Sequence, residues 1–223
     1  MLFTFANQTK EQVLTYCLTT HQIMLLSQQV NSRFDLRRVK ELPLQQYGRG
    51  DEISTLNSDI WQVYRGVVQL SKIRSNGTEI VLGWVTANGT FGNNLDRCGL
   101  YRAVALSEVY AKRYSSQDII EHPSLARQFF SQFSDRLIKS QQLLSILAIK
   151  SVEKRLEQLL LMLKQEMGQP VTEGVRLQVR FTHQHLAEVL NTTRVTVTRI
   201  LGSFQNQNLI YFDARRHIVI KDI

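Results

Sequence analysis

Two arginines and a threonine near the C-terminus carry the most distinctive chemistry of the sequence. In the run TTRVTVTRILGSFQN, Arg194, Thr196 and Arg199 stand apart from the apolar residues Val197 and Ile200 on a predicted helix. An arginine can bond both O6 and N7 of guanine in the major groove of DNA. Threonines and free backbone N–H groups at a helix N-terminus can hold a phosphate. The run therefore indicates a helix that contacts duplex DNA.

Two short helices joined by a turn are expected to position these side chains. Thr182 is a good N-cap for the first helix, the pair Asn191-Thr192 ends it, and Thr193 is the N-cap of the second. Ala187 is the small residue expected where the two helices cross. The pattern predicts a helix-turn-helix. The alternative, a helical hairpin in a core without a binding role, fits the paired arginines less well.

A basic hairpin follows the second helix. Residues 209–212 and 217–221 are the predicted strands of a two-stranded wing, and residues 213–216 form its Asp-Ala-Arg-Arg tip. An alternation of apolar and polar residues over 175–181 predicts a further strand. Residues 174–223 carry seven Arg or Lys and three Asp or Glu, and the whole chain has a net charge of +8. This surplus favours a polyanionic partner.

Upstream, the periodicity changes from β-like to helical. Between about residues 44 and 114, short apolar runs separated by Gly and Asn-Gly predict an antiparallel barrel or roll. Pro123 begins a helix that is predicted to reach about Lys150, and a second helix is predicted over 152–167 with Gly168 as a left-handed C-cap. The fold class is therefore α+β: an N-terminal antiparallel β-roll (a cupin-like double-stranded roll), a long helix and a C-terminal winged helix-turn-helix. The predicted domain boundaries are 1–122, 123–150 and 151–223.

The long helix carries apolar residues on more than one face. One face can pack on the roll and the other on a second copy of the chain, so the sequence predicts a homodimer. The alternative is a helix buried inside a monomer. The predicted dimer contacts are Phe133, Leu137, Leu144, Leu147 and Ala148.

Composition argues against several other classes of protein. The chain has 223 residues, 43% hydrophobic and 21% charged, which is typical of one or two globular domains. Two cysteines without CxxC spacing and five dispersed histidines predict no metal site. No signal peptide or membrane-length apolar run is seen, so a cytoplasmic protein without a membrane partner is expected. No catalytic motif is present, and an enzyme is the disfavoured alternative.

The stretch TTRVTVTRILGSFQNQNLI resembles the DNA-binding domain of the cyclic-AMP receptor/FNR family of bacterial transcription regulators. Its Thr-Arg-Val-Thr-Val-Thr-Arg run is especially similar to the cyanobacterial global nitrogen regulators of that family. The segments VYRGVVQLSK, NGTEIVLGWV and NGTFG resemble the family's sensor roll. The resemblance covers about residues 44–220 and leaves residues 1–40 unexplained. It implies a transcription regulator that binds a palindromic promoter site as a homodimer.

The resemblance assigns roles to individual residues of the DNA-binding part. Arg194 and Arg199 match the family's base-reading arginines, and Val195 stands where cyclic-AMP-responsive members have a glutamate. A valine cannot accept a hydrogen bond from cytosine N4, so the half-site should differ from that of the cyclic-AMP-responsive members. In the nitrogen regulators the same valine accompanies arms of the type GTA…TAC, and the resemblance implies such arms here. The phosphate-contacting positions, with the basic wing tip added, are Thr182, Gln184, Thr193, Thr196, Arg215 and Arg216.

In the sensor part, the chain departs from the pattern of cyclic-nucleotide binders. These proteins have Phe-Gly-Glu, a short helix and then Arg-Ser/Thr-Ala for the phosphate. Here Phe91 and Gly92 are followed by Asn93, and the segment to Arg97 is too short for that helix. Cyclic AMP is therefore not the expected effector.

The match to the 2-oxoglutarate site of the nitrogen regulators is also partial. Arg136 matches their helix arginine, whereas Gln141 replaces its partner glutamate. The strand arginine before Tyr101 is missing, and Arg102 or Arg97 would have to substitute for it. A dicarboxylate needs fixed cationic partners. 2-Oxoglutarate stays a candidate effector, with a weak or absent response expected.

The partners implied by this interpretation are double-stranded DNA, a second copy of the chain and RNA polymerase. A regulator that needs no ligand, or that needs a protein coactivator docked on the roll, is equally consistent with the degenerate pocket. A non-specific nucleic-acid-binding protein is the alternative from a different class.

Overall fold

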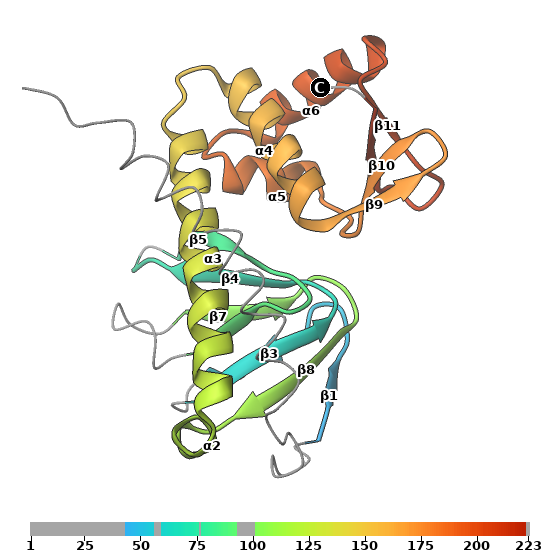
Figure 1. Ribbon diagram of the computed structural model, residues 1–223. Coiled ribbons are helices and arrows are strands. Elements are labelled where there is room, and N and C mark those ends of the chain that lie inside the picture. Colours follow the sequence, from blue (N-terminus) through green and yellow to red (C-terminus); the bar gives the residue numbers. More distant parts are fainter. Residues whose placement is uncertain (1–42, 56–58, 76, 93–100, 222–223) are drawn as a thin grey trace, which may run out of the picture. The chain divides into compact units, whose positions relative to one another are not determined.

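A computed structural model of the chain describes residues 43–55, 59–75, 77–92 and 101–221. All of them belong to one compact unit, Glu41–Ile223. Antiparallel strands come first along this unit, a long helix follows them, and helices with a small sheet complete it (Figure 1). The predicted α+β fold class, with a roll, a long helix and a winged helix-turn-helix, is confirmed.

The roll consists of two four-stranded antiparallel sheets that share a core. The first sheet, in spatial order, contains β1 (Gln45–Tyr47), β8 (Val109–Tyr114), β3 (Ile60–Arg65) and β6 (Thr90–Gly92). The second contains β2 (Glu52–Ile53), β7 (Arg102–Ala105), β4 (Val68–Ile73) and β5 (Glu79–Val85). Trp61 and Val63 of the first sheet pack with Val68 and Leu70 of the second, which explains the apolar runs of the sequence.

The Asn-Gly signal between β4 and β5 marks a hairpin, as predicted. β4 and β5 pair antiparallel from Val68↔Val85 to Ile73↔Glu79. Gly77 lies in the connection with φ of +80°, in the left-handed region that such turns require.

Three helices follow the roll, and their starts are set by local signals. They are α2 (Ser116–Glu121), α3 (Pro123–Leu147) and α4 (Val152–Met167). Proline occupies the first position of α3, and the Ser151 hydroxyl caps α4 by accepting from Lys154 N. α3 ends at Leu147, slightly before the predicted Lys150.

Gly168 corrects one expectation from the sequence. It is extended, with φ of −75°, and begins a strand instead of forming a left-handed C-cap. A Cβ at this position would lie 2.2 Å from Lys164 O and 2.4 Å from Val175 Cγ1. The glycine is therefore required by the close approach of helix and strand.

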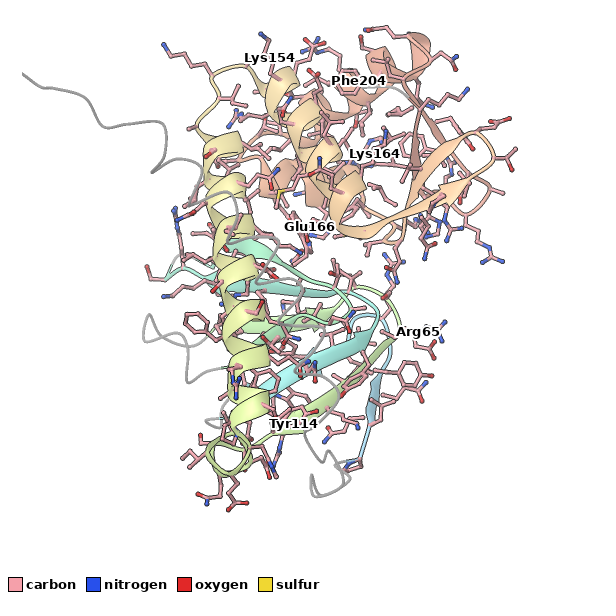
Figure 2. The ribbon with its side chains drawn as sticks, viewed as in Figure 1. Arg65, Tyr114, Lys154, Lys164, Glu166 and Phe204 are labelled. Carbon is pink, nitrogen blue, oxygen red and sulfur yellow. The ribbon has the colours of Figure 1, made fainter. Side chains whose placement is uncertain are left out.

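The two apolar faces of α3 have different environments within one chain. Leu125 and Phe129 pack against Ile60 and Tyr114 of the roll (Figure 2 labels Tyr114). A second set of large apolar side chains on α3 is exposed: Phe130, Leu137, Ile138 and Leu144. Among the predicted dimer contacts, Phe133 and Leu147 pack partly inside the chain, and Ala148 is the C-cap of the helix.

The C-terminal part is a four-stranded sheet packed with helices. The sheet contains, in spatial order, β11 (Ile210–Phe212), β12 (Ile218–Ile220), β10 (Gly174–Leu177) and β9 (Gly168–Val171), and the helices are α5 (His183–Val189) and α6 (Arg194–Asn206). The strand predicted over 175–181 is only partly correct, because β10 ends at Leu177. Val179 and Phe181 are buried in the helical core without belonging to a strand.

The turn between β3 and β4 allows a direct test of the roll. Gly66 has a φ of +93° and Gly50 has a φ of +95°, so both lie in the left-handed region. A Cβ on Gly66 would lie 2.2 Å from Glu108 O, whereas a Cβ on Gly50 has nothing within 4 Å. Left-handed strain costs each alanine variant about 1–2 kcal/mol. Gly66→Ala should lose about 1–3 kcal/mol more through the clash. Urea unfolding monitored by tryptophan fluorescence measures both losses, and equal losses would contradict this packing.

Candidate nucleic-acid interface

Two threonine caps define the helix-turn-helix. The Thr182 hydroxyl accepts a hydrogen bond from His185 N at 3.0 Å, at the start of α5. The Thr193 hydroxyl accepts one from Thr196 N at 3.2 Å, at the start of α6. Asn191 between the helices has φ of +50°, a left-handed conformation that ends α5. Both predicted caps and the predicted break are confirmed.

One face of α6 is committed to the core. Its apolar residues Val197, Ile200, Leu201 and Phe204 are all buried. Ala187 of α5 is 1% exposed in the same cluster, as expected of a small residue at the helix crossing. This packing orients the opposite face of α6 towards solvent.

The exposed face of α6 carries the predicted base-reading residues. Arg194 and Arg199 are exposed, and Val195 between them is 78% exposed. Within the described part of the chain, neither guanidinium takes part in an ion pair. The exposed Val195 side chain contributes no buried apolar surface to the fold of this chain. A valine in this position suits contact with a thymine methyl group, and the two arginines beside it suit guanine edges.

The predicted phosphate contacts gather at the starts of α5 and α6. Thr193 is exposed and its hydroxyl lies 2.9 Å from that of Thr196, in the first turn of α6. Thr182 and Gln184 are exposed at the start of α5, where Gln184 Nε2 donates to Glu188 Oε1 at 2.8 Å. These hydroxyl and amide groups lie beside the free N–H groups of helix N-termini, where anions are favoured.

Asp213 organises the tip of the wing. Its Oδ1 accepts hydrogen bonds from Arg215 N at 2.9 Å and His217 N at 2.7 Å. Although desolvation opposes the change, the bonds and charge of His217 hold the pKa of Asp213 below its ordinary value. The ionised carboxylate thereby fixes a tight turn in which Arg215 and Arg216 are exposed. The basic tip predicted from the sequence is present.

Sequence reasoning missed a polar contact that joins the two helices. His183 Nδ1 of α5 lies 2.8 Å from the Thr198 hydroxyl of α6. Burial, with the Arg194 charge acting in the same direction, lowers the pKa of His183. A neutral imidazole can thus hold α6 against α5. No signal in the sequence indicates this pairing, because a histidine and a threonine at this separation have no characteristic spacing.

A further group, here called the junction cluster, joins the helix-turn-helix to the roll. It consists of Gln69 and Trp84 on β4 and β5, with Phe181 and His185 from the C-terminal part. The Trp84 and Phe181 rings meet edge to face at 5.9 Å, and the Phe181 and His185 rings lie 5.3 Å apart. His185 Nε2 also hydrogen-bonds Gln69 Oε1. These contacts tie the orientation of α5 to β5.

The predicted effector residues on β6 and before β7 contribute to the core of the roll. Phe91 is fully buried in the roll core and stacks on Trp61 at 6.3 Å. A Cβ on Gly92 would lie 2.3 Å from Asp59 O, so this glycine is needed for the pairing of β3 with β6. Tyr101 is 4% exposed in the same core. The Phe-Gly pair therefore has a structural role whether or not an effector binds.

The described charged members of the predicted pocket have different surroundings. Arg102 Nε donates to Glu52 Oε2 at 2.8 Å, and this hydrogen bond raises its pKa. Arg136 lines two cavities between α3 and β5, whereas Gln141 is exposed and lines neither. Two further predicted residues, Asn93 and Arg97, lie outside the described residues.

Other kinds of site were also sought among the described residues. No group of three or more His, Cys, Asp or Glu side chains in this part of the chain could hold a metal ion. No helix of the described ranges is long and apolar enough to cross a membrane.

Comparison with known proteins agrees with this geometry. Residues 154–223 match the Crp-like helix-turn-helix domain. The chain is 31% identical over 199 residues to the global nitrogen regulator of Synechococcus elongatus, covering 82% of this chain and 89% of that protein. The chain belongs to the CRP/FNR family of transcription regulators. It is also 31% identical over 175 residues to the regulatory protein CysR of the same organism, covering 77% of this chain and 81% of that protein.

Solved structures show the same CRP/FNR fold. A CRP-family transcriptional regulator from Thermus thermophilus superposes with a TM-score of 0.69 at 18% identity, covering 80% of this chain and 92% of that one. FixK2 from Bradyrhizobium japonicum also gives a TM-score of 0.69 at 18% identity, covering 82% and 94%. The family resemblance inferred from the sequence is therefore confirmed, and the helix-turn-helix is that of a DNA-binding transcription regulator.

The junction cluster predicts that the stability of this CRP/FNR-family chain depends on pH. Burial lowers the pKa of His185; Glu188 and Glu79 oppose the change, and Arg49 adds to it. The unfolded chain therefore takes up this proton more readily, so stability is complete above about pH 6.5 and falls as the pH drops below it.

His185→Gln keeps a donor for Gln69 and removes the titration. The free energy of unfolding, measured by urea titration between pH 5 and pH 8, should fall less steeply below pH 6.5 in the variant. Some slope should remain, because the pKa of His183 is lowered as well. An unchanged slope would show that His185 is not held neutral by this contact.

Proposed function

We propose that the protein is a sequence-specific transcription regulator that binds a palindromic promoter site as a homodimer. The observation that carries this proposal is the exposed row Arg194, Val195 and Arg199 on α6. α6 lies in the major groove of each half-site, and the arms of the site have the form GTA…TAC. Specific binding is favoured over non-specific binding because an exposed valine adds nothing to phosphate affinity.

Each side chain has a distinct part in this proposal. Arg194 and Arg199 bond guanine O6 and N7, and Val195 contacts a thymine methyl group. Thr182, Gln184, Thr193 and Thr196 contact phosphates and fix the register of the helix, together with Arg215 and Arg216 on the wing. Phosphate contacts alone would give salt-dependent binding without sequence preference.

The exposed apolar face of α3 supports the proposed homodimer. Phe130, Leu137, Ile138 and Leu144 are 75%, 60%, 62% and 66% exposed in one chain. A row of this kind along one helix is typical of an interaction surface. Reading two half-sites one turn of DNA apart requires two α6 helices about 34 Å apart, and a dimer paired along α3 would supply the second one.

The similarity to global nitrogen regulators supports a nitrogen- or carbon-related signal. The pairing of Arg102 with Glu52 and the exposure of Gln141 support a weak or absent 2-oxoglutarate response. RNA polymerase is the proposed partner of the promoter-bound dimer. A protein coactivator remains the alternative source of control, and a non-specific nucleic-acid-binding protein remains the alternative function.

The reading of bases by α6 is tested with Arg199→Ala. On a palindromic duplex with GTA…TAC arms, the variant should lose about 1–3 kcal/mol of binding free energy and discriminate less at one base pair of each half-site. Fluorescence anisotropy against the cognate duplex and singly substituted duplexes measures both effects.

Arg74→Ala is the matched control, because Arg74 is exposed on the turn between β4 and β5 and its loss changes the net charge equally. The control should retain cognate affinity and discrimination. If Arg199→Ala and Arg74→Ala discriminated equally well among duplexes, α6 would not be the reading helix.

The dimer is tested with Leu137→Glu on the exposed face of α3. A buried glutamate at a dimer seam would lack a partner, so the variant should be monomeric at micromolar concentration while the natural chain is dimeric. Light scattering measures the mass of each. Gln128→Glu, at another exposed position of α3, adds the same charge and should stay dimeric. A natural chain that is monomeric would refute the proposed assembly.

A further inference from the structure

The tip of the wing contains a backbone conformation that its residue does not favour. Among the described residues other than glycine, a positive φ occurs at Asn88, Asn191, Asn208 and Arg216. Asparagine is enriched in the left-handed region because its short polar side chain can bond the local backbone. Arginine has no such compensation, so the φ of +64° at Arg216 carries a steric cost. Arg216 is thus held in this region against its own preference.

The turn at the tip requires a left-handed residue, but it does not require an arginine. Asp213 N donates to His217 O at 3.0 Å, and Arg216 N donates to Asp213 O at 2.9 Å. This pattern is that of a three-residue hairpin loop, in which a left-handed residue follows a type I turn and is usually glycine. A glycine at position 216 would close the same turn without the steric cost. A strained residue that the fold does not need points to a role for its side chain.

Contacts of the Asp213 carboxylate hold the tip in one conformation. Its Oδ1 accepts hydrogen bonds from the backbone of the tip, and its Oδ2 lies 3.5 Å from Arg176 Nη1 and 3.3 Å from His217 Nδ1. Arg176 belongs to β10, so a strand outside the wing braces the tip. A loop that is already ordered loses little conformational entropy when it binds a partner.

The base of the wing lies beside the start of α5. The Phe212 ring, one residue before the tip, lies 5.9 Å from the His183 ring. His183 is the first residue of α5 and follows Thr182, one of the proposed phosphate contacts. His183 Nδ1 also lies 2.8 Å from the Thr198 hydroxyl of α6. The tip therefore begins where α5 is proposed to meet the DNA backbone.

The chemistry of the tip suits a minor groove. Arg215 and Arg216 are exposed, and in the ranges that the structure describes neither guanidinium forms an ion pair. The double helix places a minor groove on each side of the major groove, so a wing beside a major-groove helix faces a minor groove. A narrow minor groove of A·T pairs has an enhanced negative potential that attracts arginine. In a G·C pair the guanine N2 amino group projects into this groove.

We propose that Arg216 enters the minor groove adjoining each GTA…TAC arm and selects A·T base pairs there. Its guanidinium donates to adenine N3 and thymine O2, the acceptors that both orientations of an A·T pair present. Arg215 contacts the phosphate backbone. This inference rests on the proposed function and goes beyond it, because it makes one wing residue a determinant of specificity outside the arms. The steric cost at Arg216 is offset by a contact that exists only on DNA.

Anisotropy titrations of the full chain with three duplexes test this proposal. All three keep the GTA…TAC arms, and the pairs adjoining each arm are A·T, G·C or inosine·C. Inosine presents the major-groove edge of guanine but lacks the N2 amino group. The A·T and inosine·C duplexes should each bind about fivefold more tightly than the G·C duplex, at the low end of the effect of one wrong base pair. Equal affinities for the inosine·C and G·C duplexes would overturn the proposal.

Two variants separate the side chain from the properties of the DNA. Arg216→Asn removes the guanidinium but keeps a residue that tolerates the left-handed conformation, and it should lose the fivefold preference. Arg215→Asn removes the same charge from the neighbouring position. It should weaken binding to all three duplexes by a similar factor and keep the preference. A preference that survives in Arg216→Asn would come from DNA deformability and would refute the role of Arg216.

Arg216→Gly gives a second readout that needs no DNA. Glycine relieves the left-handed strain, so the urea midpoint of unfolding should rise. The midpoint of Arg215→Gly should fall, because Arg215 has no positive φ and glycine adds freedom to the unfolded chain. A lower midpoint in Arg216→Gly would show that the arginine serves the fold, and it would contradict the proposal.

A fourth duplex with scrambled arms separates this inference from the proposed function. Equal affinities for intact and scrambled arms would overturn the proposed function and this inference with it. A preference for intact arms without any preference at the adjoining pairs would overturn this inference alone.

Discussion

The placement of α6 depends on one continuous apolar core. Val67, Val81 and Trp84 of the roll belong to the same buried cluster as the apolar residues of α4, α5 and α6. Burial of apolar surface is the dominant favourable contribution to folding, and it is not directional. The edge-to-face contact of Trp84 with Phe181 and the bond between His185 and Gln69 add the direction that the apolar contacts lack. The exposed face of α6 is thus a consequence of what its opposite face packs against.

Polar contacts at the edges of this core fix geometry more than they add stability. The Glu166 side chain is 8% exposed and pairs with Lys139 across α3 and α4. The desolvation of such a pair offsets much of its attraction, so its net contribution to stability is small. The ion pair of Lys139 with Glu166 therefore acts mainly to fix the position of α4 against α3. The contact between His183 and Thr198 likewise fixes the position of α6 against α5, and a neutral imidazole is sufficient to form this hydrogen bond.

The parts of the fold that were predictable are those set by local chemistry. Thr182 and Thr193 each bond an amide three residues later, so the sequence alone revealed both helix starts. Gly168 was misinterpreted because a C-cap glycine and a glycine required by close packing look identical in a sequence. Phe181 was assigned to a strand because apolar and polar residues alternate up to it. The assignment was wrong because such alternation indicates which side chains are buried and does not show that the backbone pairs with another strand. The exposed face of α6 was predictable because the apolar residues that the core buries recur at helical spacing along its sequence.

Contacts between residues that are far apart in the chain could not be predicted from the sequence. Gln69 and His185 are 116 positions apart, and no spacing rule connects them. The cavities at Arg136 depend in the same way on side chains from β4, β5, α3 and α4.

The central claim, that α6 reads a palindrome, is most directly tested by selecting bound duplexes from a random-sequence pool with the full chain. We predict enrichment of a two-fold symmetric site with GTA…TAC arms one helical turn apart. Recovery of duplexes without a common sequence, or with a single asymmetric motif, would contradict it.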